Sequence, residues 1–304
     1  MKLLVLGSSA GGGFPQWNCN CPNCHGLRQG TIKATARTQS SIAISENGSD
    51  WLLINASPDI LTQIQQNPAL QPARSIRDSG IAAVLLMDAQ IDHVTGLLML
   101  RERSSPLPVY ATQSVLDDLH SGLPLINTLS HYCTVTPHKI QTDQPSFTVD
   151  GFNHTTFSVI PVSSKAPPYS PHRHQPSTGD NIALIIRNQQ TGKTIFYAPG
   201  LEKIDAHVRD AMHKADILLV DGTFWSNDEM IRLGLSKKYA RDMGHLPQSG
   251  SDGMIDALKP FQHKRRILIH INNSNPVLQE DSAEALQLQR EGIEVAVDKM
   301  TIDF

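Results

Sequence analysis

The sequence predicts an α/β fold, and three observations support that prediction. Short apolar runs alternate with helix-like segments along all 304 residues. The run 81–87 is apolar throughout, as expected for a strand buried on both faces. Polar side chains able to do chemistry follow this run directly. They are expected at the carboxyl edge of the sheet, where open α/β folds place their sites.

Each predicted element rests on its own local pattern. Segments rich in β-branched residues, bounded by Gly, Pro and Asn, predict about ten strands. Asn47-Gly48, between the second and third of them, is a strong hairpin signal. Periodic apolar positions predict four helices. The predicted strands are 2–6, 41–45, 51–55, 81–87, 157–162, 182–187, 194–198, 217–221, 266–270 and 294–297, and the predicted helices are 59–66, 114–121, 235–241 and 282–291.

Composition restricts the partners and the location that we expect. Hydrophobic residues make up 39% of the chain, charged residues 18%, and the net charge is -3, so nothing indicates nucleic-acid or membrane-surface binding. The apolar run Leu3 to Leu6 is too short for a secretory signal, and no stretch approaches the roughly 18 apolar residues of a membrane span. We therefore expect one cytoplasmic domain over residues 1–304 that binds a small or peptide-derived molecule. A homodimer stays open.

Three of the four cysteines form one group, Cys19, Cys21 and Cys24, with the spacing C-x-C-x-x-C. Thiolates at this spacing can converge on one tetrahedral ion, which predicts a structural zinc site in the loop of about 17–26. The alternative is a set of free cysteines. The fourth ligand is not identified, because His25 is poorly placed beside Cys24 and a residue from a distant loop is an equal candidate. Cys133 is interpreted as an ordinary core or loop thiol.

A second candidate metal site follows the apolar run 81–87. Asp88, Gln90, Asp92 and His93 lie within six positions, and His270 ends a predicted strand far along the chain. Asp92, His93 and His270 form a two-histidine, one-carboxylate set with open positions, which is typical of non-haem Fe(II) enzymes that use O2. The opposing interpretation is that Asp92 caps the following helix and His93 is an ordinary polar residue.

The proline-rich segment 165–176 interrupts the regular pattern and predicts a semi-rigid loop. It contains His172 and His174, and such an H-x-H pair can bind a metal. The plainer interpretation is a solvated surface loop that ligates nothing. A third possibility is a lid over the site.

These residues resemble the metallo-β-lactamase superfamily, whose first motif is H-x-H-x-D-H at a strand end. Asp88 and Gln90 stand in the place of the two leading histidines, whereas Asp92, His93 and His270 match. The retained residues are those that build the second metal site of the superfamily.

Other superfamily ligands are missing from the sequence. The third histidine, expected near 162–164, is absent, and the segment 198–200 reads Ala-Pro-Gly where the bridging aspartate belongs. Two-metal hydrolysis needs both ions. A metallo-hydrolase is therefore the least favoured function.

A closer resemblance, to the pyrroloquinoline quinone (PQQ) biosynthesis protein B family, covers nearly the whole chain. It implies a metallo-β-lactamase-like αββα sandwich of two mixed sheets flanked by helices, and a structural zinc on the cysteines. The motifs that together carry it are AGGGFPQWN at 10–18, the cysteine group, DHVTGLLMLRE at 92–102, DGTFW at 221–225, DEM at 228–230 and MGHLPQSG at 243–250.

The resemblance also implies a function. It points to Fe(II)-dependent and O2-dependent hydroxylation of the tyrosine ring of a crosslinked Glu-Tyr precursor of PQQ, with Asp92, His93 and His270 holding the metal. Zinc can replace iron at such a site on isolation. The alternative is a non-catalytic carrier for the precursor or for PQQ itself. In related phosphodiesterases a histidine three positions after the last motif histidine completes the zinc site, and here that position is Asn273.

The remaining candidates surround this predicted centre. His245, after the predicted basic helix 235–241, is a candidate catalytic acid or anion binder, or else a histidine stabilised by a helix terminus. The side chains expected to bind substrate are Asp88, Gln90, Asp221, Thr223 and Trp225.

Overall fold

The computed structural model describes residues 1–304 and divides into two compact units. The first unit contains Met1–Gly7, Ser41–Thr194 and Lys299–Phe304, and the second contains Ser8–Ser40 and Ile195–Asp298. The strands are divided between a sheet of seven and a sheet of six. No helix is both long enough and apolar enough to cross a membrane. The expectation of one domain over 1–304 stays a prediction.

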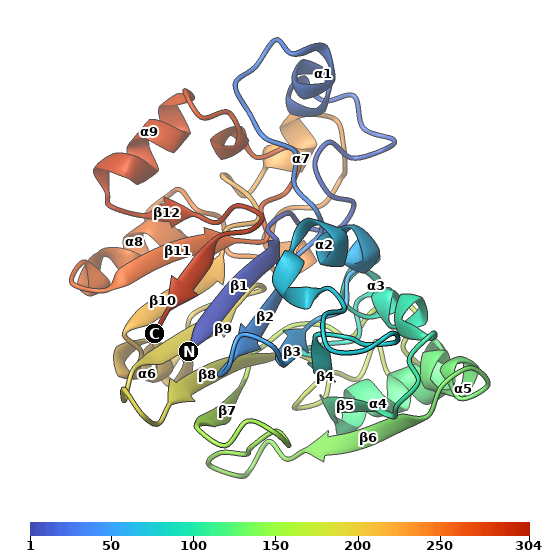
Figure 1. The fold of residues 1–304 in the computed structure, drawn as a ribbon. Helices are drawn as coiled ribbons and strands as arrows, with labels where there is room; N and C mark the ends of the chain where they lie inside the picture. Colours follow the sequence, from blue (N-terminus) through green and yellow to red (C-terminus); the bar gives the residue numbers. More distant parts are fainter. The chain divides into compact units, whose positions relative to one another are not determined.

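The seven-stranded sheet lies in the first unit, in the order β13-β1-β2-β3-β4-β5-β6 (Figure 1). Pairing is antiparallel from β13 to β3 and parallel from β3 to β6, so the sheet is mixed. The bounds are β1 Lys2–Gly7, β2 Ser41–Ser45, β3 Trp51–Ile54, β4 Ile81–Leu85, β5 Leu107–Thr112, β6 Val135–Ile140 and β13 Thr301–Asp303.

The first unit also holds four short helices and an antiparallel strand pair. Leu53, Val84 and Val109 are fully buried in a core cluster that also contains Ile60 at the start of α2. Packing of this kind makes up for the low intrinsic stability of helices of four to seven residues. The bounds are α2 Ile60–Gln66, α3 Ile91–Val94, α4 Gln113–Asp117, α5 Leu125–Leu129, β7 Thr155–Pro161 and β8 Ile182–Asn188.

The second unit is built on parallel strands. Its β10 ends at Asp221 and β11 ends one residue before His270, so both polar residues lie at the carboxyl edge of the strands. The bounds are β9 Thr194–Ala198, β10 Ile217–Asp221, β11 Arg265–Ile269, β12 Glu294–Val295, α1 Pro22–Gln29, α6 Ala206–Lys214, α7 Glu229–Arg232, α8 Met254–Leu258 and α9 Ala283–Arg290.

Several predicted strands are found with their predicted bounds, including Ser41–Ser45 and Ile217–Asp221. The predicted strand 81–87 ends earlier, at Leu85. Its last residue, Met87, donates its N–H to the Asn55 side chain rather than to a strand carbonyl. Strands β5, β6 and β13 were not predicted, because β5 and β6 contain proline and β13 has only three residues.

The predicted basic helix over 235–241 is wrong. The N–H groups of Leu235 and Ser236 both bond back to the carbonyl of Met230, and the N–H of Ala240 bonds to that of Asn227. These bonds form a loop, and only a short 3₁₀ turn follows at Arg241–Met243. His245 is therefore not at the end of a helix in that segment.

Candidate metal and catalytic sites

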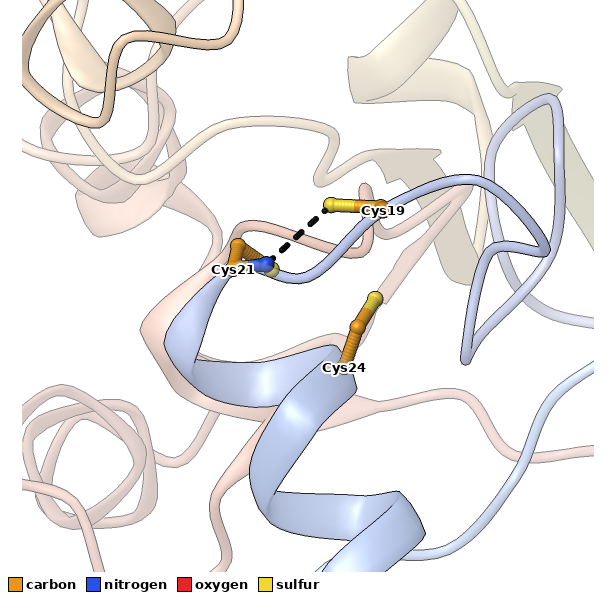
Figure 2. Close-up of side chains that lie close together, drawn as sticks. All are labelled: Cys19, Cys21 and Cys24. Carbon is orange, nitrogen blue, oxygen red and sulfur yellow. Dashed lines mark hydrogen bonds between the residues drawn. The ribbon is translucent and has the colours of Figure 1, made fainter.

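The three clustered cysteines of the second unit point toward one another (Figure 2). Cys19 lies in the loop before α1, Cys21 is the residue before its first turn, and Cys24 lies within it. All three side chains are buried, and their sulfur atoms lie within 4.8 Å of one another. A zinc–sulfur distance of about 2.3 Å in a tetrahedral site places two sulfurs about 3.8 Å apart. The group therefore fits a zinc ion without rearrangement of the backbone.

The side-chain amide of Asn273 lies at the fourth corner of this cluster. Its Nδ2 is 3.1 Å from Sγ of Cys19, 3.6 Å from that of Cys21 and 3.3 Å from that of Cys24. A fourth ligand on a tetrahedral zinc would lie about 3.5 Å from each sulfur. Rotation of the amide by 180° exchanges Nδ2 and Oδ1, and only the oxygen can coordinate a metal. Asn273 can therefore supply the ligand that the sequence left open, whereas exposed His25 contacts Asn20 instead.

The thiols differ in acidity. Burial acts to raise the pKa of Cys19, but hydrogen bonds from Cys21, Cys24 and Asn273 outweigh burial, so the pKa is lowered. Burial and the neighbouring sulfurs raise the pKa of Cys21 to about 12. Cys19 is therefore better able than Cys21 to begin metal binding as a thiolate.

A second polar cluster of the second unit contains two imidazoles joined by one hydroxyl group. The Oγ1 of Thr223 lies 2.8 Å from Nδ1 of His270 and 3.0 Å from Nδ1 of His245. The same hydroxyl donates to Oδ1 of Asp221 at 2.6 Å, and Oδ2 of Asp221 lies 2.8 Å from Nδ1 of His245. The two rings are stacked with centroids 5.2 Å apart.

These contacts determine the tautomers of both histidines. Asp221 is fully buried and its carboxylate can only accept, so Nδ1 of His245 must carry a proton. The Thr223 hydroxyl gives its only proton to Asp221 and therefore accepts from Nδ1 of His270. In its neutral form each imidazole thus presents an unprotonated Nε2, which can bind a metal or take up a proton.

Asp221, His245 and His270 also have the spacing of a metal site, since their ligand atoms lie within 4.8 Å of one another. The Asp221 carboxylate, however, already accepts bonds from the backbone N–H groups of Leu201 and Thr223 as well as from the two side chains. A metal on Asp221 would break several of these bonds. They favour a positioning role for Asp221 rather than metal binding or direct contact with substrate.

In the first unit, Asp88 holds His93. Both carboxylate oxygens lie close to Nδ1 of His93, at 2.8 and 2.9 Å, and both side chains are buried. Nε2 of His93 then lies on the side of Asp92, 3.6 Å from its Oδ2. A metal-ligating imidazole usually donates a hydrogen bond from its other ring nitrogen to a carboxylate, and Asp88 is placed to accept that bond from His93. Gln90 precedes α3, and its N–H donates to Asp88.

Burial acts to lower the pKa of His93, but the charges of Asp88 and Asp92 raise it to about 9. The metal-free imidazole is therefore protonated at neutral pH. A metal must displace this proton to bind Nε2, and Asp88 then stabilises the neutral Nδ1–H form.

The proline-rich loop lies in the first unit. His172 places Nε2 2.9 Å from the buried carboxylate of Asp180 and Nδ1 3.0 Å from the hydroxyl of Ser170, so both ring nitrogens already have partners. His174 is exposed. The hydroxyl of Tyr169 donates to the carbonyl of Ala89, in the segment that carries Asp88 and Asp92. The loop is therefore anchored beside that segment, and its histidines do not form a ready metal site.

The predicted Fe(II) set divides between the units. Asp92 and His93 belong to the first unit and His270 to the second. The assignment of these three residues to one metal therefore stays a prediction. Trp225 and Thr223 both lie in the second unit; Thr223 is buried, and the Trp225 N–H donates to the carboxylate of Glu229.

Sequence reasoning missed several polar residues that support these clusters. They lie in or against the Asn-rich run that follows His270. This run could have indicated a hydrogen-bonded cluster, because buried amides need hydrogen-bond partners. The missed residues are Asn23, Glu229, Asn272, Ser274 and Asn275.

Comparison with known proteins identifies the family. The chain is 60% identical over 301 residues to coenzyme PQQ synthesis protein B of Cupriavidus necator, with 99% of each chain covered, and 55% identical to that of Azotobacter vinelandii over the full length of both. The chain belongs to this family. Residues 50–271 also match the β-lactamase superfamily domain. The role of the chain therefore lies in the synthesis of coenzyme PQQ.

Solved structures agree with this family and fold. A Zn²⁺-bound PqqB from Methylobacterium extorquens has a TM-score of 0.90 and 36% identity, with all of both chains covered. A diphosphatase of the PhnP family has a TM-score of 0.68 at 18% identity, covering all of this chain and 96% of its own, which shows a shared fold alone. The predicted metallo-β-lactamase fold, with two mixed sheets and flanking helices, is confirmed.

Proposed function

We propose that this chain is an iron-dependent oxygenase of PQQ synthesis, which hydroxylates the tyrosine ring of a crosslinked Glu-Tyr precursor. Asp92, His93 and His270 would hold Fe(II), and the cysteine cluster with Asn273 would hold zinc. The zinc-bound family member supports metal binding by the family.

The observation that carries the proposal is the bond between Asp88 and His93. A superfamily hydrolase uses the position of Asp88 for a histidine that binds its first metal. Here the carboxylate at that position is bonded to His93, a residue of the second metal site, and is not free to bind a first metal. The site would therefore hold one metal instead of two. Asp92, His93 and His270 would supply three ligands, a set that is typical of Fe(II) sites for O2 chemistry.

The residues of the chain have separate tasks in this reaction. Bound Fe(II) would supply the activation of O2. Asp88 holds His93 in its Nδ1–H form, and Thr223 does the same for His270. His245, oriented by Asp221, offers Nε2 as a base for the phenolic proton of the substrate.

The test is anaerobic loading of the purified protein with Fe(II), followed by O2, a crosslinked Glu-Tyr substrate and a two-electron reductant. Insertion of one atom of O2 into a C–H bond reduces the other atom to water. This reduction consumes two further electrons, which the reductant must supply. We expect a mass gain of one oxygen that depends on iron and carries label from ¹⁸O2.

His93→Ala and His270→Ala should both lose iron binding and turnover and keep the cysteine-bound zinc. Cys133→Ser is a matched control, because Cys133 lies in the core cluster of the first unit and in neither candidate site. Unchanged oxygen consumption in the histidine variants would contradict the proposal. No mass change, together with tight binding of PQQ, would instead identify a carrier.

A further inference from the structure

We propose that the cysteine cluster positions the imidazoles of His245 and His270 through the loop Ile271–Asn275, so that zinc bound to the cysteines affects which ring nitrogen of each histidine carries the proton. Asn23 and Asn275 are the positioning residues of this connection. The inference concerns hydrogen bonds within one unit and does not depend on the oxygenase reaction.

The first link joins the cysteine helix to the loop. Asn23 lies in α1 between Cys21 and Cys24. Its Nδ2 donates to the carbonyl of Asn273 at 3.0 Å and to that of Asn275 at 2.8 Å. Asn273 also places its side-chain amide among the three sulfurs. Metal binding that orders the cysteines therefore fixes both ends of this three-residue stretch.

The second link joins the loop to the turn after β10. Nδ2 of Asn275 donates to the carbonyls of Gly222 and Thr223, each at 3.1 Å. The N–H of Asn272 donates to the Thr223 carbonyl as well, at 3.0 Å. The backbone of Thr223 thus takes its position from the loop.

The third link is the Thr223 hydroxyl. It lies 2.8 Å from His270 and 3.0 Å from His245, and its bond to Asp221 leaves it only accepting capacity toward the imidazoles. A displacement of Thr223 by a few tenths of an ångström weakens these bonds, because the strength of a hydrogen bond falls as its distance and angle depart from the ideal values. The imidazole of His270 would then be free to place its proton on Nε2.

Burial makes the connection stiff. Asn272, Asn273, Ser274 and Asn275 are each at most 8% exposed. A buried amide that loses its partner pays a desolvation penalty, so the loop has few alternative arrangements. Movement at the thiols is therefore transmitted to Thr223 rather than absorbed by the loop.

The experiment uses Asn23→Asp in the full-length, zinc-loaded protein with ¹⁵N-labelled histidine, on a His93→Ala background in which the predicted second site is not expected to hold zinc on His270. The carboxylate can keep the bond that Asn23 Oδ1 accepts from Gln279, at 2.8 Å, and its second oxygen cannot donate to the two carbonyls and repels them. Long-range ¹H–¹⁵N spectra report the tautomers of His245 and His270. We expect the ratio of the Nδ1–H to the Nε2–H tautomer of His270 to fall by about tenfold, the effect of one lost hydrogen bond, with zinc content unchanged.

Two further samples keep the test decisive. Gln279→Leu removes the other bond of Asn23 and should leave the histidine signals unchanged. Removal of zinc with a chelator from the His93→Ala protein, in which only the cysteine cluster is expected to hold zinc, should shift the same signals as Asn23→Asp. This sample covers the case in which the Asn23 variant does not fold. Unchanged histidine signals in the zinc-free protein would overturn the inference, as would a shift in Gln279→Leu equal to that in Asn23→Asp.

Discussion

Asn273 is placed to complete a zinc site on the cysteine cluster with a neutral amide oxygen. Asn273→Ala should therefore lower zinc affinity by about 10- to 100-fold, because water must take the fourth position. Asn273→Asp should retain or increase the affinity, because a carboxylate oxygen is an ordinary zinc ligand. Competition with a chromophoric chelator measures both. Equal affinities for wild type and Asn273→Ala would show that the amide does not bind the metal.

Glu229 is a buried carboxyl group that accepts bonds from the Trp225 N–H and the Ser274 hydroxyl. Burial raises its pKa from 4.5 to about 7. A raised carboxyl pKa means that folding favours the protonated form. Its contribution to stability is present below pH 4.5 and is lost as the pH rises through 7, about 3 kcal/mol in total.

Glu229→Gln should remove this part of the pH dependence, since a carboxamide stays neutral. Urea unfolding at pH 5 and pH 8 measures it. We expect the wild type to lose more stability than the variant between the two pH values. An equal loss of stability in both proteins between pH 5 and pH 8 would show that Glu229 is not the source of this pH dependence.

Single residues differed in how far the sequence could predict them. Asp92, His93 and the cysteines carry recognisable spacings. The sequence left three roles open for Asp88, which were to bind the metal, to bind substrate or to hold a ligand histidine, and the choice of the last needed the structure. Asn23 and Asn275 have no motif, since their function depends on contacts between residues 252 and 52 positions apart in the sequence.

At the scale of elements, the turn that carries His93 is closed by backbone contacts. The N–H of Ala56 donates to the His93 carbonyl at 2.7 Å, and the N–H of Gly96 donates to the Ala56 carbonyl at 2.9 Å. A Cβ on Gly96 would lie 2.1 Å from the carbonyl oxygen of Ser57, and the backbone cannot yield easily.

Gly96→Ala should therefore destabilise the protein by about 3 kcal/mol or more, the upper range for overpacking. Gly200→Ala is the control, because its Cβ would meet only the His245 ring, at 3.8 Å. Thermal unfolding compares the two variants. Similar melting temperatures for both would mean that the turn is less tightly closed than these contacts indicate.

The proline-rich loop should loosen at high pH. The hydrogen bond to Asp180 raises the pKa of His172 above its ordinary value of 6.5. A raised histidine pKa gives stabilisation that is complete below pH 6.5 and is lost as the pH rises through the folded value. Hydrogen exchange in 165–180, corrected for the intrinsic rate, should accelerate above that value. His172→Gln should show no such step, and a step that survives in the variant would exclude His172 as its cause.

Elements with a strong local pattern were predicted well and the others were not. Runs such as Ile217–Asp221 are apolar and β-branched, so the chain fixes them locally. In β6, most side chains are at least partly exposed, and its pairing with β5 over six residues defines it. The segment 235–241 was predicted as a helix, but the N–H groups of Leu235 and Ser236 bond back to Met230, directly after Gly234 with its φ of 66°.

For the whole molecule, zinc should control the order of the segment Ser8–Ser40, which has little regular structure beyond α1. Arg28 donates to the carbonyls of Cys19 and Gln16. Zinc removal should therefore expose Arg28 to trypsin. Arg77, in an exposed segment of the first unit, should be cut at the same rate with and without zinc. Resistance at Arg28 after complete zinc loss would show that the segment is held without the metal.

His270 has a left-handed backbone, with φ of 64°, and the chain reverses there into the loop that ends at Asn275. Only two residues separate His270 from Asn273, so one turn serves both predicted metal sites. Adding or deleting a single residue between them would misplace one ligand whenever the other was in position. Loop length is therefore under tighter constraint than loop sequence, and changes of length in this family should be confined to other loops.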